Sequence, residues 1–169
     1  KFRRQRQMCI RDRINTAQKI ESTVDKLYTS YILSKNNIKT PDTFIFRDFE
    51  KAKKFLDTQL PKEGIVYKPL FGSQGDNVKL IKSSYELKEI ENLSNIFYFQ
   101  QYLDNSINHD YRILVIRKDE TYKYFYMTRY GDSFINNVSK GGSCKKESID
   151  KSIIDLALKA SKLLNISFC

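Results

Sequence analysis

Hydrophobic residues recur along the chain at two spacings, which predict a mixture of helices and strands. Some stretches place apolar residues three or four positions apart, as on one face of a helix. Shorter stretches are rich in aromatic and β-branched residues, which is typical of half-buried strands. The predicted helices are Ile14–Ser34, Asp48–Leu60, Asp150–Leu164 and a short one from Ser83 to about Asn92, and the predicted strands are Thr43–Phe46, Ile65–Lys68, Val78–Ile81, Phe97–Leu103, Tyr111–Arg117 and Tyr122–Tyr130.

This order of elements predicts an α+β chain with two small sheets, each partnered by helices. The composition supports a buried core and excludes a wholly disordered chain, because 40% of the residues are hydrophobic and 13% aromatic. No apolar run approaches the ~20 residues of a membrane-spanning helix, and no apolar segment follows the basic start as in a signal peptide. Cys9, Cys144 and Cys169 share no ligand-like spacing, so we expect a cytoplasmic protein without a disulfide framework or zinc site.

Positive charge is concentrated at the start of the sequence. The net charge is +10, and half of it lies in Lys1–Arg13, which holds six basic residues and one acid. Such a run is interpreted as an arm that binds phosphates, as a solvated tail, or as a segment that is not native to the protein. We favour the last interpretation, because QMCIRDR resembles translated adapter sequence. We therefore base no function on residues 1–13 and do not expect a nucleic-acid partner.

The stretch most informative about chemistry runs from Lys68 to Val78 (KPLFGSQGDNV). A lysine ends one predicted strand, a loop with two glycines follows, and another strand begins. Glycines allow backbone N–H groups to approach phosphate oxygens, and a lysine supplies a positive charge for the same anion. The alternative is an ordinary hairpin whose glycines adopt positive φ. The loop is not a Walker A motif, because no GK[ST] follows and no helix starts there.

Other candidate residues gain weight only in combination. Lys26 starts a helix, where a lysine is usually solvated. Gln100–Leu103 ends a strand whose backbone groups could read an adenine edge. Asp110 and Arg112 lie two residues apart on one face of a strand, which also suits a structural salt bridge. No serine or cysteine lies in a nucleophile motif, and the single histidine, His109, is expected in a surface loop.

Taken together, these segments resemble the ATP-grasp superfamily, most closely the RimK-like carboxylate–amine ligases, which include α-L-glutamate ligases. In chain order the similar segments are DK, KPLFGSQGDNV, QQYL, HDYRILVI and MTRYGDSFINNVSKGG. The similarity runs from about Ile14 to the last residue. It implies an ATP-grasp fold of two small α+β lobes with the nucleotide cleft between them. Residues 14–95 would form the N-terminal lobe with the end of the preceding domain, and residues 96–169 an incomplete C-terminal lobe.

The resemblance also implies roles for individual residues. Lys26 and Lys68 would hold the nucleotide phosphates, and Asp110 would bind the nucleotide at its ribose. The loop that starts at Gly72 would fold over the triphosphate. The other implied site residues are Ser73, Gln74 and Gly75 in that loop, Gln101 and Tyr102 at the adenine hinge, Asn136 and Asn137 near the phosphate, and Arg112 and Arg129 as catalytic residues, with Arg129 facing the transferred phosphoryl group.

The sequence departs from the family pattern at several positions. Asn77 replaces a loop glycine, although asparagine tolerates a left-handed backbone better than other residues. Gln101 replaces the hinge acid and can still accept a hydrogen bond from an adenine amino group. Ile135 replaces an arginine, which removes a charge near the nucleotide. The family's magnesium ligands belong to segments that we expect beyond the end of this chain, so we predict no metal ligand here and expect an internal fragment that is inactive alone.

The implied function is ATP-dependent amide formation. A substrate carboxylate attacks the γ-phosphate to give an acyl phosphate and ADP, and an amine such as glutamate then displaces phosphate. The expected ligands are ATP, magnesium, a carboxylate and an amine, and the full-length parent is expected to be a homo-oligomer. Three alternatives stay open, a non-catalytic nucleotide-binding module, a basic nucleic-acid-binding domain and a structural α+β domain with no ligand.

Overall fold

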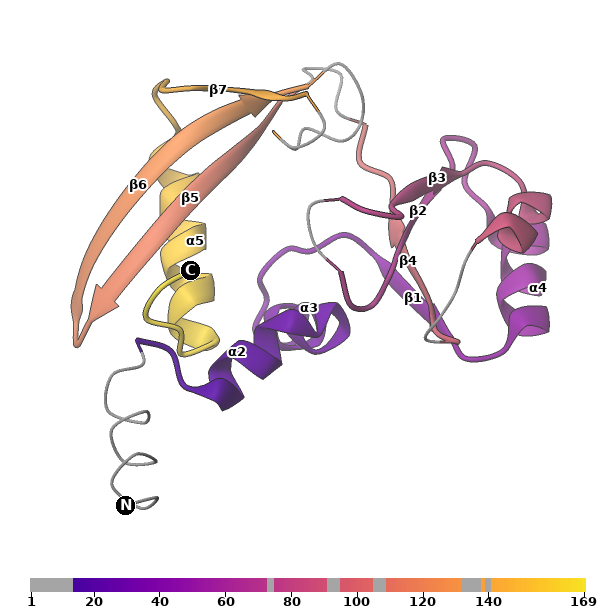
Figure 1. Cartoon of the computed structure of the whole chain (residues 1–169), viewed down its shortest axis with the longest axis horizontal. Coiled ribbons are helices and arrows are strands. Elements are labelled where there is room, and N and C mark those ends of the chain that lie inside the picture. Colours follow the sequence, from indigo (N-terminus) through magenta and orange to yellow (C-terminus); the bar gives the residue numbers. More distant parts are fainter. Residues whose placement is uncertain (1–13, 73–74, 91–94, 105–108, 132–137, 139–140) are drawn as a thin grey trace, which may run out of the picture. The chain divides into compact units, whose positions relative to one another are not determined.

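The computed structural model describes residues 14–72, 75–90, 95–104, 109–131, 138 and 141–169, and the chain divides into two compact units. The first unit combines separate segments, namely the residues up to Ile38, Asp110–Arg129 and Cys144–Cys169. The second unit contains Lys39–His109 and Tyr130–Ser143. Two antiparallel sheets and several helices form the described part of the chain (Figure 1). The predicted α+β class with two small sheets is therefore confirmed.

The second unit is built on an antiparallel sheet with the strand order β1-β4-β2-β3. Strand β4 lies at the centre of this sheet, paired with β1 on one side and β2 on the other. Successive side chains of a strand point to opposite faces, so β4 sends Phe97 and Phe99 to one face and Tyr98 and Gln100 to the other. The strands are β1 (Thr43–Phe46), β2 (Ile65–Lys68), β3 (Lys79–Ile81) and β4 (Phe97–Gln101).

An aromatic core lies between this sheet and helix α4 (Phe49–Gln59), with the 3-10 helix η1 (Ser84–Glu89) beside it. The ring of Phe55 in α4 lies 4.7 Å from that of Phe44 and 6.3 Å from that of Phe99. Burying each such side chain contributes about 2–3 kcal/mol. The buried members of the core are Ala52, Phe55, Leu56, Ile65, Tyr67, Ile81, Leu87, Phe97 and Phe99.

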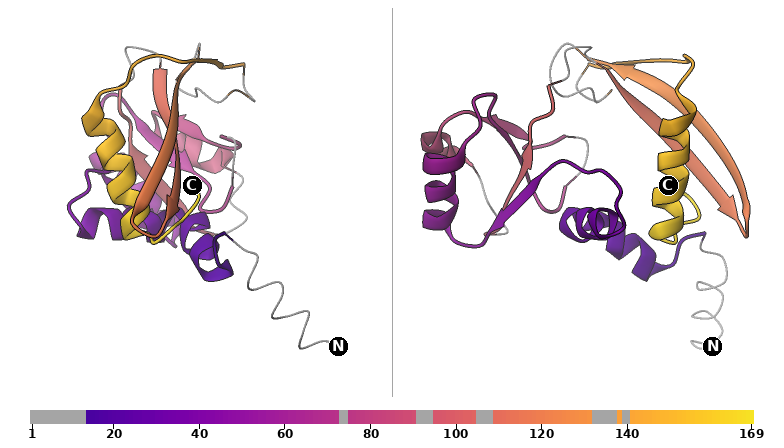
Figure 2. Two further views of the ribbon diagram at one scale, coloured as in Figure 1. Left: turned by 90° about the vertical axis from the view of Figure 1, so that its left-hand side faces the viewer. Right: turned by 180° about the vertical axis from the view of Figure 1, so that it is seen from behind.

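The second sheet, most of which belongs to the first unit, is a long hairpin of β5 (His109–Lys118) and β6 (Thr121–Tyr130) extended by β7 (Ser143–Lys145). Helix α5 (Lys151–Leu163) runs along one face of this hairpin, as the views in Figures 1 and 2 agree. The last residues of the chain pair with the edge of β5. Val115 and Cys169 exchange two backbone hydrogen bonds of 2.7 and 3.1 Å.

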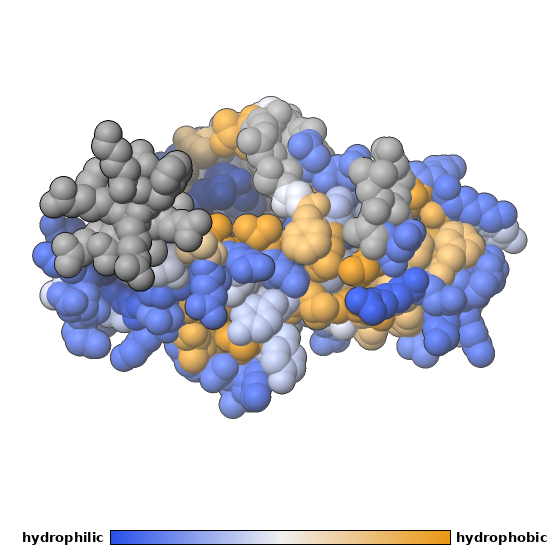
Figure 3. All heavy atoms as spheres, turned by 60° about the horizontal axis from the view of Figure 1, so that its bottom comes forward, coloured by the Kyte–Doolittle hydropathy of each residue, from blue (hydrophilic) through white to orange (hydrophobic). Residues whose placement is uncertain are grey.

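Helices α2 (Ala17–Val24) and α3 (Lys26–Lys35) complete the first unit and contain no buried residue. Side-chain caps fix the starts of both helices. The side chain of Thr16 accepts from a backbone N–H group of α2, and the Asp25 carboxylate accepts from two backbone N–H groups of α3 at 2.9 and 3.2 Å. Helix α3 also contacts α5. Exposed apolar residues are frequent here, and Figure 3 shows hydrophobic residues at the surface among hydrophilic ones.

Several elements differ from the sequence prediction. The helix expected over Ile14–Ser34 is divided at Asp25, whose backbone is extended (φ −76°, ψ 105°). Strand β6 ends at Tyr130, as predicted, whereas β4 ends at Gln101 instead of Leu103. The helix expected after Ser83 is a 3-10 helix, and β7 was not expected.

The division into units also differs from the expected boundary between residues 95 and 96. Strand β4 belongs to the sheet of the second unit because its backbone pairs with β1 and β2. The residues before Ile38 group instead with the C-terminal segments. Asn15 makes this link, since its Oδ1 accepts from the backbone N–H of Ser167 at 2.9 Å and its Nδ2 donates to the carbonyl of Phe168 at 2.7 Å.

Two further findings concern the described residues alone. No helix among them is long and apolar enough to cross a membrane. Cys144 and Cys169 are exposed free thiols, whereas Cys9 lies outside the described residues. His109, expected in a loop, is the first residue of β5, and its ring centroid lies 5.5 Å from that of Tyr130.

Gly64, which precedes β2, offers a test of a local backbone constraint. It has a φ of 92°, and a Cβ at this position would lie 2.7 Å from the carbonyl oxygen of Ile81. Gly141 has a φ of 95°, but among the described residues no atom beyond those of the glycine itself and its chain neighbours lies within 4 Å of its corresponding Cβ position. We expect Gly64→Ala to lower the free energy of unfolding by about 1–3 kcal/mol more than Gly141→Ala, because a clash is added to the strain that both share. Urea unfolding measures both, and equal losses would contradict this account.

Candidate functional site

Lys68 is held at the end of β2 by a chain of hydrogen bonds within the second unit. Its Nζ donates to Oε1 of Gln100 at 2.7 Å. The Nε2 of Gln100 in turn donates to Oγ1 of Thr43 at 3.2 Å, and that hydroxyl donates to the carbonyl of Pro41 at 3.0 Å. Because Tyr67 belongs to the aromatic core, its neighbour Lys68 points to the opposite face of the sheet. The predicted phosphate-binding lysine is thus tied to β4 and β1.

The loop after β2 has the backbone that its residue types favour. Gly72, Gly75 and Asn77 have φ values of 153°, 78° and 55°. Positive φ is accessible to glycine and, among other residues, best to asparagine. The expectation that asparagine would tolerate the left-handed region at this loop position is therefore confirmed. Ser73 and Gln74, also predicted to contact the nucleotide, lie outside the described residues.

The predicted adenine hinge follows the end of β4. Gln101 is exposed and Tyr102 is half-buried. The backbone N–H of Gln101 donates to the carbonyl of Asp42 at 2.8 Å, so this group is engaged within the protein. This N–H group is therefore one donor fewer among the backbone groups that were predicted to read an adenine edge at this strand end. The side-chain amide of Gln101 keeps the predicted capacity to accept a hydrogen bond.

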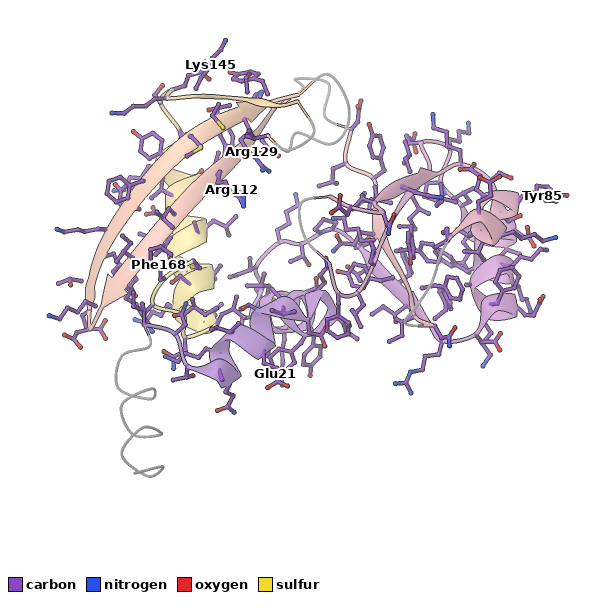
Figure 4. All side chains as sticks on the ribbon, in the orientation of Figure 1. Glu21, Tyr85, Arg112, Arg129, Lys145 and Phe168 are labelled. Atoms are coloured by element: carbon purple, nitrogen blue, oxygen red, sulfur yellow. The ribbon has the colours of Figure 1, made fainter. Side chains whose placement is uncertain are left out.

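Asp110 and Arg129 form a two-point ion pair across the β5–β6 hairpin. Nε of Arg129 donates to Oδ1 of Asp110 at 2.7 Å, and Nη2 donates to Oδ2 at 2.9 Å. These hydrogen bonds raise the pKa of Arg129 above its ordinary value, against the opposing effect of burial. The salt bridge that β5 alone suggested, between Asp110 and Arg112, is not the one that forms. Arg112 is exposed on the same hairpin, where Figure 4 labels it beside Arg129.

Lys26 is the first residue of α3 and is half-buried. Burial lowers the pKa of its ammonium group below the ordinary value, and the neighbouring carboxylate of Asp25 opposes this effect. The positive end of the helix dipole also disfavours a cation in the first turn. The position is thus less solvated than a typical lysine at a helix start, and a bound anion would stabilise its charge.

The described site residues fall into two groups, one in each unit. The residues brought into direct contact are Asp110 with Arg129 and Lys68 with Gln100. Sequence reasoning considered Gln100 only for its backbone groups and missed its side chain and Thr43 as parts of the site, although the alternation of β4 places Gln100 on the face of Tyr98. Asn136, Asn137 and Ile135 lie outside the described residues. Within the described ranges, no group of three or more His, Cys, Asp or Glu residues could hold a metal ion.

Comparison with models of known families matches most of the chain to one family. The model of the RimK-like ATP-grasp domain matches residues 23–169. The chain belongs to the RimK-like ATP-grasp family. This match includes Lys26, Lys68, Asp110 and Arg129, and so spans the candidate residues of both units.

Curated relatives of this RimK-like chain include ligases from archaea. It is 34% identical over 157 residues to the coenzyme gamma-F420-2:alpha-L-glutamate ligase of Methanococcus maripaludis, with 90% of this chain and 54% of that protein covered. It is 32% identical over 148 residues to the alpha-aminoadipate–LysW ligase LysX of Saccharolobus solfataricus, with 83% and 52% covered. The chain thus spans about half the length of the curated relatives it matches.

Solved structures similar to the RimK-like chain are ATP-grasp ligases. The D-alanine–D-alanine ligase of Coxiella burnetii matches with a TM-score of 0.67 and 15% identity, over 90% of this chain and 44% of that one. The ATP-grasp ligase PsnB, in complex with minimal precursor, Mg and ADP, matches with a TM-score of 0.63 and 18% identity, over 92% and 46%. At these identities the likeness concerns the fold, and it confirms the predicted ATP-grasp fold.

The Asp110–Arg129 pair can be compared with a simpler ion pair in the same chain. Lys53 and Asp57 on α4 are joined by one 2.9 Å hydrogen bond between more exposed side chains. We expect a double-mutant cycle of Asp110→Asn and Arg129→Gln to give a coupling of about 1 kcal/mol, because two-point geometry and partial burial strengthen the pair. The cycle of Lys53→Gln and Asp57→Asn should give a smaller value. Urea unfolding measures both, and equal couplings would show that the two-point geometry adds nothing.

Proposed function

We propose that this RimK-like chain is the ATP-binding part of a carboxylate–amine ligase. The observation that carries the proposal is the family match across residues 23–169. In the proposed reaction a carboxylate oxygen attacks the γ-phosphorus of ATP, so that an acyl phosphate forms and ADP leaves. An amine nitrogen then attacks the acyl carbon, phosphate leaves, and the nitrogen loses a proton as the amide bond forms. The alternative is a nucleotide-binding module without catalysis. It requires ATP binding, as this proposal does, but neither of the two reaction steps.

Phosphoryl transfer requires the protein mainly to position groups and to stabilise negative charge. We assign the nucleotide phosphates to Lys68 and Lys26. The fixed ammonium of Lys68 supports this role, and so does the lowered pKa of Lys26, which a phosphate anion would counteract. We assign the transferred phosphoryl group to Arg129, assisted by Arg112. Asp110 then has a second role beside the predicted ribose contact, because its two hydrogen bonds orient the guanidinium of Arg129.

The remaining nucleotide contacts are proposed from the family pattern. The glycine loop would follow the triphosphate, which its positive φ values support. The exposed side chain of Gln101 would accept from the adenine amino group. The full proposed set is Gly72, Ser73, Gln74 and Gly75 in the loop, Gln101 and Tyr102 at the hinge, and Asn136 and Asn137 near the phosphate.

Magnesium is the second cofactor that the family implies. The PsnB ligase is described in complex with Mg and ADP. The described residues of this chain do not fit a metal site by themselves, because no group of three or more His, Cys, Asp or Glu residues lies together among them. We therefore assign no step of the reaction to a magnesium ligand of this chain, and magnesium stays a predicted cofactor.

The class of substrate is proposed from the relatives. Several of them are named as alpha-L-glutamate ligases, including the tetrahydromethanopterin:alpha-L-glutamate ligase of Methanocaldococcus jannaschii. We propose that an amino acid, with glutamate as the first to test, is the amine that this ligase joins to a carboxylate. A cytoplasmic location and a homo-oligomeric full-length protein stay predictions of the same proposal.

ATP binding through Lys68 can be tested on the chain as it stands. Lys68→Ala should weaken MgATP binding about 10- to 100-fold, because a charge-assisted hydrogen bond to phosphate is lost. Lys54→Ala is the matched control, since Lys54 is an exposed lysine on α4 in the same unit and has no proposed role. Isothermal titration calorimetry measures both variants. Equal affinities of the Lys68→Ala variant and the unchanged chain would refute the assignment.

The nucleic-acid alternative can be tested by removing residues 1–13. We expect a variant that starts at Ile14 to lose about half of the net positive charge of the chain and most of its affinity for single-stranded DNA, which depends on counterion release. MgATP affinity should be unchanged, since no proposed nucleotide contact lies in residues 1–13. Fluorescence anisotropy with labelled DNA and calorimetry with MgATP measure the two. Retained DNA affinity would instead favour the core as a nucleic-acid-binding domain.

A further inference from the structure

We infer that Gln100 is a positioning residue that fixes the ammonium group of Lys68 through an uncharged acceptor, and that Thr43 anchors Gln100 in turn. The inference rests on the proposed role of Lys68 in binding ATP phosphates. It assigns a function to two side chains, those of Gln100 and Thr43, to which the resemblance gives no role. All of the contacts that carry it lie within the second unit.

The hydrogen bonds have only one consistent direction. An ammonium group donates and cannot accept, so the atom of Gln100 that faces Lys68 at 2.7 Å must be the carbonyl oxygen Oε1. The amide nitrogen then faces Thr43, whose Oγ1 accepts at 3.2 Å. That hydroxyl uses its own proton toward the carbonyl of Pro41 at 3.0 Å. The network thus ends on a backbone acceptor, and no member can reverse its amide or hydroxyl without losing a bond.

The strand register explains why these side chains meet. Gln100 on the central strand β4 lies opposite Thr43 of β1 and Val66 of β2. Lys68 lies opposite Tyr98, one step along the same face, so it reaches Gln100 diagonally. Gln100 is 7% exposed, and a buried amide is costly unless both of its ends are hydrogen-bonded. The lysine and the threonine satisfy those two ends, and the amide cannot leave them without that cost.

The charge of the acceptor is the feature that suits phosphate binding. A glutamate at position 100 would hold the ammonium in the same place but would place a negative charge beside it, which repels a phosphate. A leucine would leave Lys68 without this restraint. Phosphate binding would then have to order the flexible lysine side chain, and this loss of entropy would weaken binding. Of glutamine, glutamate and leucine at position 100, only glutamine both holds the ammonium group of Lys68 and adds no charge.

The experiment measures the affinity of the full chain for MgATP by calorimetry. Gln100→Leu should weaken binding about 3- to 10-fold, because one hydrogen bond that orients Lys68 is lost. Thr43→Val keeps the shape and removes the hydroxyl, which accepts from Gln100 and donates to the carbonyl of Pro41, and should weaken binding about 2- to 3-fold. Gln100→Glu should weaken binding about 10-fold or more, because the hydrogen bond from Lys68 persists and the added charge opposes phosphate, although the bond that the amide donates to Thr43 is lost. If Gln100→Leu fails to fold, Thr43→Val and Gln100→Glu carry the test.

The decisive control is the Lys68→Ala background, which separates positioning from a general structural role. If Gln100 and Thr43 act through Lys68, then Gln100→Leu and Thr43→Val have no further effect on affinity once Lys68 is alanine. The same fold-loss in both backgrounds, or full affinity of Gln100→Glu in the presence of Lys68, would overturn the inference. An unchanged affinity of Lys68→Ala itself would instead overturn the proposed function of the lysine, so the two failures are distinguishable.

Discussion

The alternation of side chains along the central strand β4 is the constraint on which the second unit depends. Phe97 and Phe99 must face the aromatic core, because that core contains most of the apolar surface between the sheet and α4. Their neighbours Tyr98 and Gln100 are thereby sent to the opposite face. A shift of one residue in the strand would place Tyr98 and Gln100 in the core and remove Phe97 and Phe99 from it, so this packing fixes the register. The packing of one face thus determines where the acceptor of Lys68 lies on the other.

The first unit depends on contacts between distant parts of the sequence. Both edges of the β5–β6 hairpin are covered, by β7 on one side and by the last residues of the chain on the other. Asn15 fastens the beginning of the described chain to Ser167 and Phe168. Where these short segments pair with the hairpin, the backbone groups of its edges are not available to other chains. This explains why the unit is discontinuous in sequence.

The sequence predicts best what local periodicity determines. Strands β1 and β2 have their predicted bounds because each is a short run of aromatic and β-branched residues, and α4 lies within the predicted helix because its apolar residues recur on one face. Strand β7 is not predictable in this way, since all its residues are exposed and only backbone pairing defines it. The site follows the same rule. The pairs Lys68–Gln100 and Asp110–Arg129 join residues 32 and 19 positions apart, so strand register decides them and sequence spacing does not.

Two of the cations assigned to phosphate chemistry, Lys68 and Arg129, are held by different kinds of acceptor. Lys68 donates to a neutral amide, whereas Arg129 donates to a carboxylate whose charge balances its own. An approaching phosphate must therefore compete with Asp110 for the charge of Arg129, but it meets no such competition from Gln100. A guanidinium nevertheless presents several N–H donors in a rigid plane, and a carboxylate bound to part of that plane fixes the direction of the rest. Under the proposed function, Lys68 contributes mainly charge, and Arg129 contributes mainly orientation.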